Sequence, residues 1–181
     1  RITDSLLGGR DVLGIMPTGA GKSICYQVPA LMFDGITIVV SPLISLMKDQ
    51  VSALVQSGVA AAYINSSLTH AQYLKVLQNT ESGKYKIIYV APERLCAPAF
   101  LGICRNLNIS MVAVDEAHCV SQWGQDFRPS YLKIPDFIDA LNSRPVVGAF
   151  TATATGAVRD DIKTLLRLVS PLVVTTGFDR P

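Results

Sequence analysis

This sequence of 181 residues has no long apolar run, no cysteine pair at metal-ligand spacing and no large excess of one charge. No stretch approaches the roughly 18 apolar residues of a membrane span, so we expect no membrane partner. The first residues lack the basic and then apolar order of a signal peptide. The four cysteines contain no CxxC pair, which disfavours a zinc knuckle or disulfide framework and favours reduced thiols in the cytosol or nucleus.

The charge balance is also close to even, because 16 lysines and arginines face 14 acidic residues and leave a net charge of +2. This excludes a polybasic protein that binds by bulk charge, but not binding of nucleic acid through backbone N–H groups and a few cations. A hydrophobic fraction of 49% and a charged fraction of 17% exclude a disordered chain. Composition therefore predicts one compact intracellular domain and indicates no function.

Short apolar runs alternate with longer helix-like segments along the chain. The runs are rich in Val and Ile and mostly lack polar alternation, which is typical of buried strands in a parallel sheet. We place strands at residues 12–16, 37–41, 61–65, 86–90, 111–115, 146–150 and 172–176, and helices at 21–33, 43–56, 69–81, 131–141 and 155–168. This order predicts an α/β fold with a mostly parallel central sheet and helices on both faces.

A glycine-rich segment lies between the first predicted strand and the first predicted helix. It reads Met16, Pro17, Thr18, Gly19, Ala20, Gly21, Lys22 and Ser23. Backbone N–H groups of such a turn surround a phosphate, and glycine permits the close approach. We expect residues 18–23 to bind a nucleotide, with Lys22 at the β- and γ-phosphates and Ser23 on Mg²⁺. Because Met16 stands where the general pattern has glycine, an ordinary strand-to-helix turn is the alternative.

Two adjacent carboxylates, Asp115 and Glu116, follow the fifth predicted strand. Ligands of open α/β sheets bind outside the carboxyl ends of the strands, so both acids should lie beside the phosphate loop. We expect Asp115 to hold Mg²⁺ and Glu116 to polarise an attacking water. His118 is expected to link the nucleotide to a neighbouring element, with a merely structural, hydrogen-bonded histidine as the alternative.

These segments together resemble the DExH-box helicases of superfamily 2 and, more narrowly, the RecQ family of DNA helicases. Similar motifs follow one another over essentially the whole chain, at residues 16–29, 40–50, 89–95, 115–118 and 150–154. The most specific match is the aromatic loop at residues 121–129, within a stretch that has no clear periodicity. Gln125 departs from the family, which usually has histidine there, and glutamine carries no charge.

The resemblance implies a RecA-like P-loop NTPase fold, with residues 1–181 as a single ATP-binding domain and first motor lobe. It implies a parent helicase that uses ATP and Mg²⁺ to unwind duplex DNA from 3′ to 5′ in repair and recombination, in the bacterial cytoplasm with its nucleoid or in a eukaryotic nucleus. The family's upstream glutamine motif, the second RecA-like lobe with its arginine finger, and the zinc and winged-helix modules are outside this sequence. We therefore expect the isolated 181 residues to be nearly inactive. Residues 177–181 resemble the junction to the second lobe.

The resemblance also implies which residues contact single-stranded or duplex DNA, or couple DNA binding to the nucleotide. They lie after predicted strands and in the aromatic loop: Ser41, Pro42, Leu43, Pro92, Glu93, Arg94, Gln122, Trp123, Asp126, Phe127, Arg128, Thr151 and Thr153. Trp123 and Phe127 are suited to stacking on bases, and Arg128 to a phosphate or cation–π contact, with Asp126 as its partner when DNA is absent. Burial of the two aromatic rings in a satellite core is the alternative.

Two other functions stay open. The first is a nucleic-acid-binding or interaction module whose ATPase is inactive in these 181 residues. The second is a P-loop kinase or transport ATPase. The sequence shows no lid or acceptor site for the latter, which also leaves the aromatic loop and Thr151-Ala152-Thr153 unexplained.

Overall fold

Seven strands form one sheet in the computed structural model, which describes residues 1–17, 19 and 21–176. The strands are β1 (Val12–Ile15), β2 (Ile36–Val40), β3 (Ala61–Ile64), β4 (Ile87–Val90), β5 (Ile109–Val114), β6 (Val146–Thr151) and β7 (Leu172–Thr175). Their order in the sheet is β3-β4-β2-β5-β6-β1-β7, and every neighbouring pair is parallel. The predicted parallel sheet is confirmed, strand by strand.

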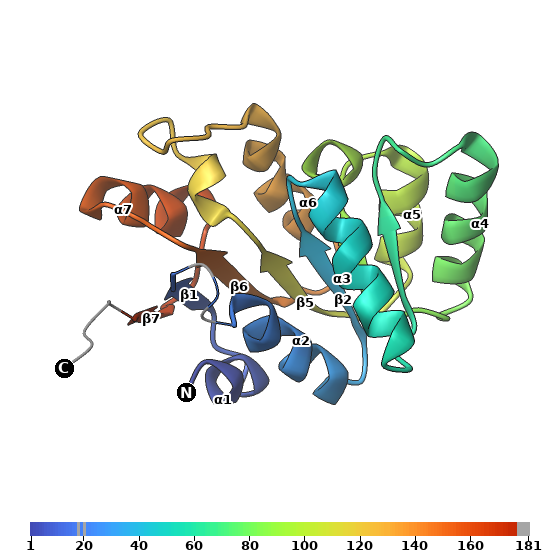
Figure 1. The fold of residues 1–181 in the computed structure, drawn as a ribbon, viewed down its shortest axis with the longest axis horizontal. Helices are drawn as coiled ribbons and strands as arrows, with labels where there is room; N and C mark the ends of the chain where they lie inside the picture. Colours follow the sequence, from blue (N-terminus) through green and yellow to red (C-terminus); the bar gives the residue numbers. More distant parts are fainter. Residues whose placement is uncertain (18, 20, 177–181) are drawn as a thin grey trace.

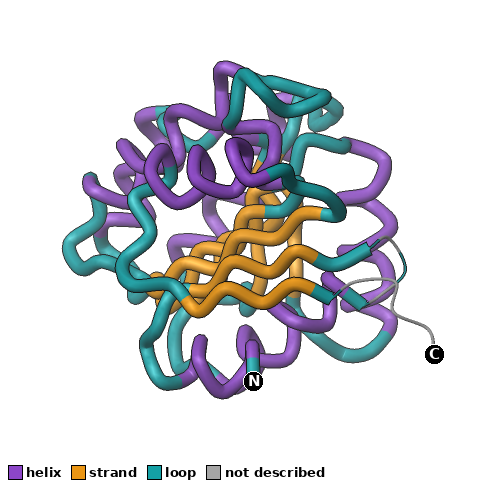
Figure 2. Tube along the Cα trace, turned by 90° about the vertical axis from the view of Figure 1, so that its left-hand side faces the viewer, coloured by secondary structure: helices purple, strands orange, loops and turns teal. Residues whose placement is uncertain are grey.

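Helices cover both faces of the sheet (Figures 1 and 2). On one face lie α1 (Ile2–Leu7), α2 (Lys22–Met32) and α3 (Ile44–Gln56), and on the other α4 (His70–Glu81), α5 (Pro98–Arg105), α6 (Ile134–Asp139) and α7 (Gly156–Leu165). Three short 3₁₀ turns, η1 (Pro92–Arg94), η2 (Ala117–Val120) and η3 (Pro129–Lys133), follow β4 and β5 or precede α6. The chain therefore has the three-layer α/β fold that the sequence predicts.

The strand residues alternate between two apolar cores. Ile38 and Val40 of β2 face the layer of α4–α7, whereas Val39 faces the layer of α1–α3. A Cβ atom at Gly14 or Gly148 would lie less than 3.0 Å from the ring of Phe150, so these two strand glycines make room for that ring. Phe150 in turn packs on Tyr26 of α2, with ring centroids 5.5 Å apart. This packing fixes the end of β6, where Thr151 stands.

Two short helices, α1 and α5, are missing from the sequence prediction, and one predicted helix is divided. The segment predicted as a helix at 131–141 contains the end of η3 and then α6. Pro135 lies in the first turn of α6, where a backbone N–H would have no hydrogen-bond partner within the helix, so proline is tolerated there. In the part of the chain that the structure describes, no helix has the length and apolar character needed to cross a membrane.

Candidate nucleotide and nucleic-acid site

The candidate site lies at the carboxyl edge of the sheet, where β1 leads through the glycine-rich segment into α2. Gly21 is the residue before α2 and has the left-handed angles φ 78° and ψ 29°, and Gly19 has φ 85°. Residues other than glycine rarely adopt these backbone angles, so the conformation of the turn requires both glycines. Lys22 and Ser23 open α2. The predicted nucleotide-binding residues Thr18 and Ala20 lie outside the described residues.

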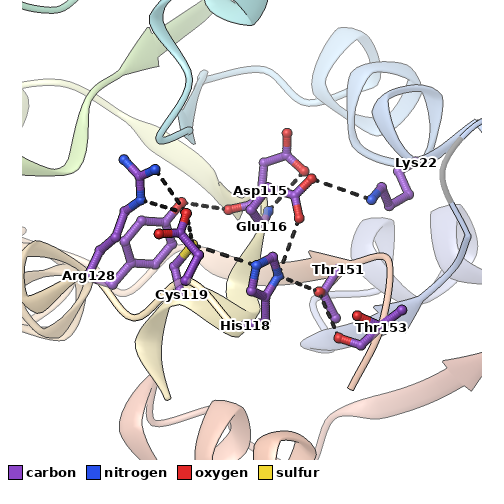
Figure 3. Close-up of polar contacts among 10 residues, drawn as sticks. Lys22, Asp115, Glu116, His118, Cys119, Arg128, Thr151 and Thr153 are labelled. Atoms are coloured by element: carbon purple, nitrogen blue, oxygen red, sulfur yellow. Dashed lines mark hydrogen bonds and ion pairs between the residues drawn. The ribbon is translucent and has the colours of Figure 1, made fainter. Parts of the chain in front are cut away.

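A chain of polar contacts starts at Lys22 and runs along this edge (Figure 3). Lys22 Nζ lies 3.7 Å from Glu116 Oε1, and His118 Nδ1 lies 3.3 Å from Glu116 Oε2. The same Nδ1 is 2.8 Å from Thr151 Oγ1, and that hydroxyl donates to the carbonyl of Thr153 at 3.1 Å. Because the Thr151 hydroxyl has one proton and uses it on Thr153, the hydrogen-bond pattern assigns the donor proton to His118 Nδ1.

The backbone after β5 separates the two acidic side chains. Glu116 has φ 48° and ψ 45°, a left-handed conformation that costs a non-glycine residue about 1–3 kcal/mol. Its N–H donates to Asp115 Oδ1 at 3.0 Å, while its own carboxylate lies beside Lys22 and His118. The two adjacent carboxylates therefore face different partners, as the two predicted roles require.

Asp115 is only 6% exposed, and the buried Tyr131 donates its hydroxyl to the Asp115 carbonyl at 2.8 Å. Burial, followed by the nearby charge of Glu116, raises the pKa of the Asp115 carboxyl to about 6, although the Glu116 N–H and Lys22 act in the opposite direction. A buried carboxylate that lacks a close cation suits a divalent metal ion. The described residues hold no cluster of three His, Cys, Asp or Glu side chains, so other oxygens must complete such a site. Ser23, phosphates and water would suit Mg²⁺, which rarely uses an all-protein cage.

The aromatic loop is tied to the segment after β2. Arg128 donates to Asp126 Oδ2 from Nε at 3.0 Å and from Nη2 at 2.9 Å, and its Nη1 donates to the carbonyl of Pro42 at 3.3 Å. Cys119 Sγ lies 3.9 Å from Asp126 Oδ2 and 3.9 Å from His118 Nε2. Two segments predicted to contact DNA, 41–43 and 121–129, therefore lie next to each other and next to His118.

Trp123 is 78% exposed and Phe127 is half-buried, so the satellite-core alternative is wrong for the tryptophan. The loop beneath is anchored, because Ser121 Oγ donates to Asp161 Oδ2 of α7 at 2.6 Å and accepts the Trp123 N–H at 3.1 Å. A Cβ atom at Gly124 would lie 2.6 Å from the His118 carbonyl, so the loop passes too close to His118 for any other residue. The tryptophan is thus presented to solvent by a fixed loop.

A cavity of about 360 Å³ separates this loop from the start of α7. His118, Trp123, Gln125 and Thr153 line it together with the first residues of the α7 segment. The cavity lies between the end of the contact chain from Lys22 and the aromatic loop, and residues of both line it.

The remaining predicted residues occupy the same edge without joining the contact chain. Ser41 is buried, and its Oγ has no hydrogen-bond partner among the described residues. Leu43, Glu93 and Gln122 are exposed, while Pro42 and Arg94 are half-buried and Pro92 is buried. No ion pair involves Glu93 or Arg94 in the part of the chain that the structure covers. Their roles stay predictions.

Sequence reasoning missed four polar residues around the site: Tyr131 under Asp115, Asp161 under the aromatic loop, Cys119 beside His118, and Tyr26 on the buried side of α2. The sequence contains only a weak signal for these residues. A tyrosine inside an apolar segment indicates a hydroxyl that needs a partner when buried, but it does not indicate which partner.

Comparisons with known proteins identify the family of the chain. A family model described as DEAD/DEAH box helicase matches residues 1–162. The chain is similar to the ATP-dependent DNA helicase RecQ of Bacillus subtilis (strain 168), at 54% identity over 92% of the chain. It is also similar to the ATP-dependent DNA helicase RecQ of Pasteurella multocida (strain Pm70), at 48% identity over 99% of the chain. The chain spans 28% of the length of each of these relatives.

Two solved structures share the fold. A hypothetical ATP-dependent RNA helicase from Sulfolobus tokodaii gives a TM-score of 0.73 at 19% identity, over 97% of this chain and 52% of that one. The DUF1998 helicase MrfA bound to DNA gives a TM-score of 0.77 at 17% identity, over 97% of this chain and 26% of that one. At this level of identity the likeness concerns the fold alone.

Proposed function

Since this chain belongs to the DEAD/DEAH box helicase family, we propose that it is the first, ATP-binding motor lobe of a RecQ-type helicase. The parent couples ATP hydrolysis to 3′-to-5′ unwinding of duplex DNA in repair and recombination. It acts in the bacterial cytoplasm with its nucleoid, or in a eukaryotic nucleus. A second RecA-like lobe of the same parent completes the motor.

The observation that carries this proposal is the continuous line of contacts from Lys22 through Glu116 and His118 to Thr151 and Thr153. One end begins in the glycine-rich turn, and the other borders the cavity beneath the aromatic loop. A P-loop kinase or a transport ATPase would leave the exposed aromatic loop and Thr151-Ala152-Thr153 unexplained.

The residues divide the work of phosphoryl transfer to water, in which positioning and electrostatic stabilisation supply most of the rate. Lys22 and the N–H groups at the start of α2 neutralise phosphate charge. Ser23 and Asp115 are the residues that would hold Mg²⁺, which supplies further charge neutralisation at the phosphates when bound. Glu116 orients the attacking water and accepts its proton. His118 contacts both the Glu116 carboxylate and the Thr151 hydroxyl and so holds the two groups in fixed relative positions.

Nucleic acid binds across the same edge of the sheet. Trp123 offers a stacking surface worth about 1–3 kcal/mol per base, without reading sequence. Arg128 exchanges Asp126 for a backbone phosphate, and the N–H groups after β2 and β4 meet further phosphates. Because Arg128 also holds the Pro42 carbonyl, its release from Asp126 alters the loop and the segment after β2 together.

The steady-state ATPase rate of the isolated 181 residues, with and without single-stranded DNA, tests the division of labour between the two lobes. We expect slow hydrolysis and little stimulation, because arginine fingers supplied from outside a site are worth about 10³–10⁵ in rate. The full-length protein, measured beside it, should be strongly stimulated by DNA. Strong stimulation of the isolated residues would contradict the proposal that a second lobe completes the site.

A further inference from the structure

A second group of polar side chains lies between α2, α3 and β4, outside the contact chain of the site, with two buried tyrosines and two half-buried glutamines. Gln27 of α2 donates from Nε2 to Gln50 Oε1 of α3 at 2.8 Å and to the hydroxyl of Tyr89 of β4 at 3.0 Å. The Tyr89 hydroxyl in turn lies 3.5 Å from the hydroxyl of Tyr26. Both tyrosines are 1% exposed. This group, Tyr26, Gln27, Gln50 and Tyr89, is called the buried relay below.

One end of the relay lies under the nucleotide site. Burial raises the pKa of the Tyr26 phenol well above its ordinary value, and the charges of Tyr89 and Asp115 raise it further, whereas the nearby Ser23 hydroxyl opposes them. Tyr26 also lies in α2 three residues after Ser23, about one helical turn from the start of the helix. It also packs on Phe150, which precedes Thr151 in β6.

The other end of the relay lies on the side where nucleic acid is proposed to bind. Gln50 belongs to α3, which begins at Ile44 immediately after the segment 41–43. The helices α2 and α3 cover the same face of the sheet (Figure 1). Apart from the relay, their shared core contains apolar side chains such as Met47, Val51 and Leu54, whose packing is not directional as a hydrogen bond is.

The contacts within the relay are unequal. The two bonds of Gln27 have ordinary lengths, but 3.5 Å between two phenol oxygens is longer than the usual 2.7–2.8 Å of an O–H···O bond. The relay is thus tight from Tyr89 to α3 and loose where it meets Tyr26. A group that changes the surroundings of the Tyr26 hydroxyl can close or open that one contact without moving apolar side chains.

We propose that the buried relay positions α3, and with it the segment 41–43, according to the state of the nucleotide site on α2. This inference rests on the proposed function and adds four positioning residues to it. Nucleotide binding at the start of α2 shifts the first turns of that helix, the Tyr26 hydroxyl closes on Tyr89, and the tighter relay fixes Gln50 and α3. The affinity of the segment 41–43 for DNA phosphates changes as a result.

The test measures the affinity of the full-length protein for a fluorescent single-stranded oligonucleotide, with and without Mg²⁺ and a non-hydrolysable ATP analogue. The ratio of the two dissociation constants is the coupling factor, commonly about 5–150 in allosteric proteins. Tyr89→Phe removes only the hydroxyl that joins Tyr26 to Gln27. We expect it to reduce the coupling factor about threefold or more, while the dissociation constant for DNA alone changes less than about twofold.

Tyr85→Phe is the matched control, because it also loses one hydroxyl contact, from Asn79 at 3.0 Å, yet lies outside the relay. We expect its coupling factor to equal that of the wild type. Gln50→Leu is the second relay variant, and it should lower the coupling factor as Tyr89→Phe does. Reciprocity requires the same loss when the affinity for the analogue is measured with and without DNA, which a purely structural role would not produce.

The outcomes separate the two proposals. A wild-type protein that binds both ligands with a coupling factor above one, and relay variants that keep that factor while the fold is retained in circular dichroism, would overturn the relay and leave the function standing. A wild-type protein that binds neither ligand would overturn both. Loss of coupling in the two relay variants, with the control unchanged, supports the relay.

Discussion

The ammonium group of Lys22 and the carboxylate of Glu116 lie 3.7 Å apart, so the predicted phosphate-binding cation is paired with the predicted water-orienting base. A triphosphate at Lys22 competes for the same ammonium group. Glu116 then retains His118 as its neighbour, at 3.3 Å. Occupation of the phosphate site therefore releases the carboxylate that the reaction needs. Variants of Lys22 and of Glu116 both test this arrangement.

Removal of either member of this pair should stop unwinding and leave DNA bound. In the full-length protein we expect Lys22→Ala and Glu116→Gln to lower strand displacement at least about 100-fold, because each removes a group that stabilises or prepares the transition state. Oligonucleotide binding should persist, since neither residue belongs to the proposed DNA-binding segments. Strand displacement is measured with a labelled duplex, and binding with anisotropy. ATP-driven unwinding by either variant would refute the assignment.

Variants of the aromatic loop should separate hydrolysis from DNA. Trp123→Ala removes the exposed stacking surface, and Arg128→Ala removes the link between Asp126 and the Pro42 carbonyl. We expect each to lower DNA-stimulated ATPase activity about tenfold or more. For Trp123→Ala the reason is a stacked base worth about 1–3 kcal/mol, and for Arg128→Ala it is the lost phosphate contact. Affinity for the nucleotide should change less than about twofold in the same variants. An equal loss of nucleotide affinity would place these residues in the nucleotide site instead.

The sheet and most helices follow from the sequence because their signals are local. Val- and Ile-rich runs such as 36–40 predict buried parallel strands, and each predicted strand is present. The short helix α1 escapes prediction because six residues carry too little periodicity. The helix predicted at 131–141 is present in part, because the end of η3 comes before α6, whose first turn contains Pro135. Order along the chain then brings Lys22 and Glu116 to one edge of the sheet, as predicted.

The contacts between distant segments do not follow from the sequence in the same way. No local pattern pairs Gln27 with Gln50, or Ser121 with Asp161, because such partners depend on how helices pack on the finished sheet. The left-handed backbone conformation of Glu116 cannot be predicted from the sequence either, because it is imposed by the surrounding structure. Sequence thus predicts the residue types at the site, and packing decides which of them touch.

The charged carboxylate of Asp115 should lower the free energy of unfolding when no metal ion is bound. Its carboxyl has a pKa of about 6 in the folded state against 3.8 ordinarily, so between these values the folded state binds more protons than the unfolded state. The free energy of unfolding therefore falls as the pH rises through this window. With EDTA at pH 8, Asp115→Asn should raise the free energy of unfolding by about 1–3 kcal/mol. The gain should vanish below about pH 3, where the wild-type carboxyl is protonated in both states.

Urea titrations at several pH values measure this difference, with the exposed Asp34→Asn as the surface control. The same variant should bind a nucleotide with less dependence on Mg²⁺ than the wild type, because the carboxylate that would hold the ion is gone. A variant less stable than the wild type at pH 8 would contradict the view that the site stores unfavourable charge.

Asp11 should be the most costly acidic residue to remove, although it lies at the end of the sheet opposite the site. Its buried carboxylate accepts from Arg144 Nη2 at 2.6 Å and Nη1 at 3.1 Å, and from the N–H groups of Val147 at 2.9 Å and Val169 at 2.7 Å. It thereby ties the start of β1 to β6 and to the segment before β7. Asp11→Ala leaves several donors without a partner, so we expect a loss of about 3–5 kcal/mol in the free energy of unfolding.

Asp139→Ala is the control for this loss, because Asp139 also pairs with an arginine, Arg167, but both side chains are 59% exposed. Exposed pairs contribute about 0–1 kcal/mol, so this variant should unfold at nearly the wild-type urea concentration. Since Asp11 touches no residue of the site, the coupling factor of Asp11→Ala, measured where the variant is still folded, should match the wild type. Similar losses of stability in the two variants would show that burial of the Asp11 carboxylate does not decide its contribution.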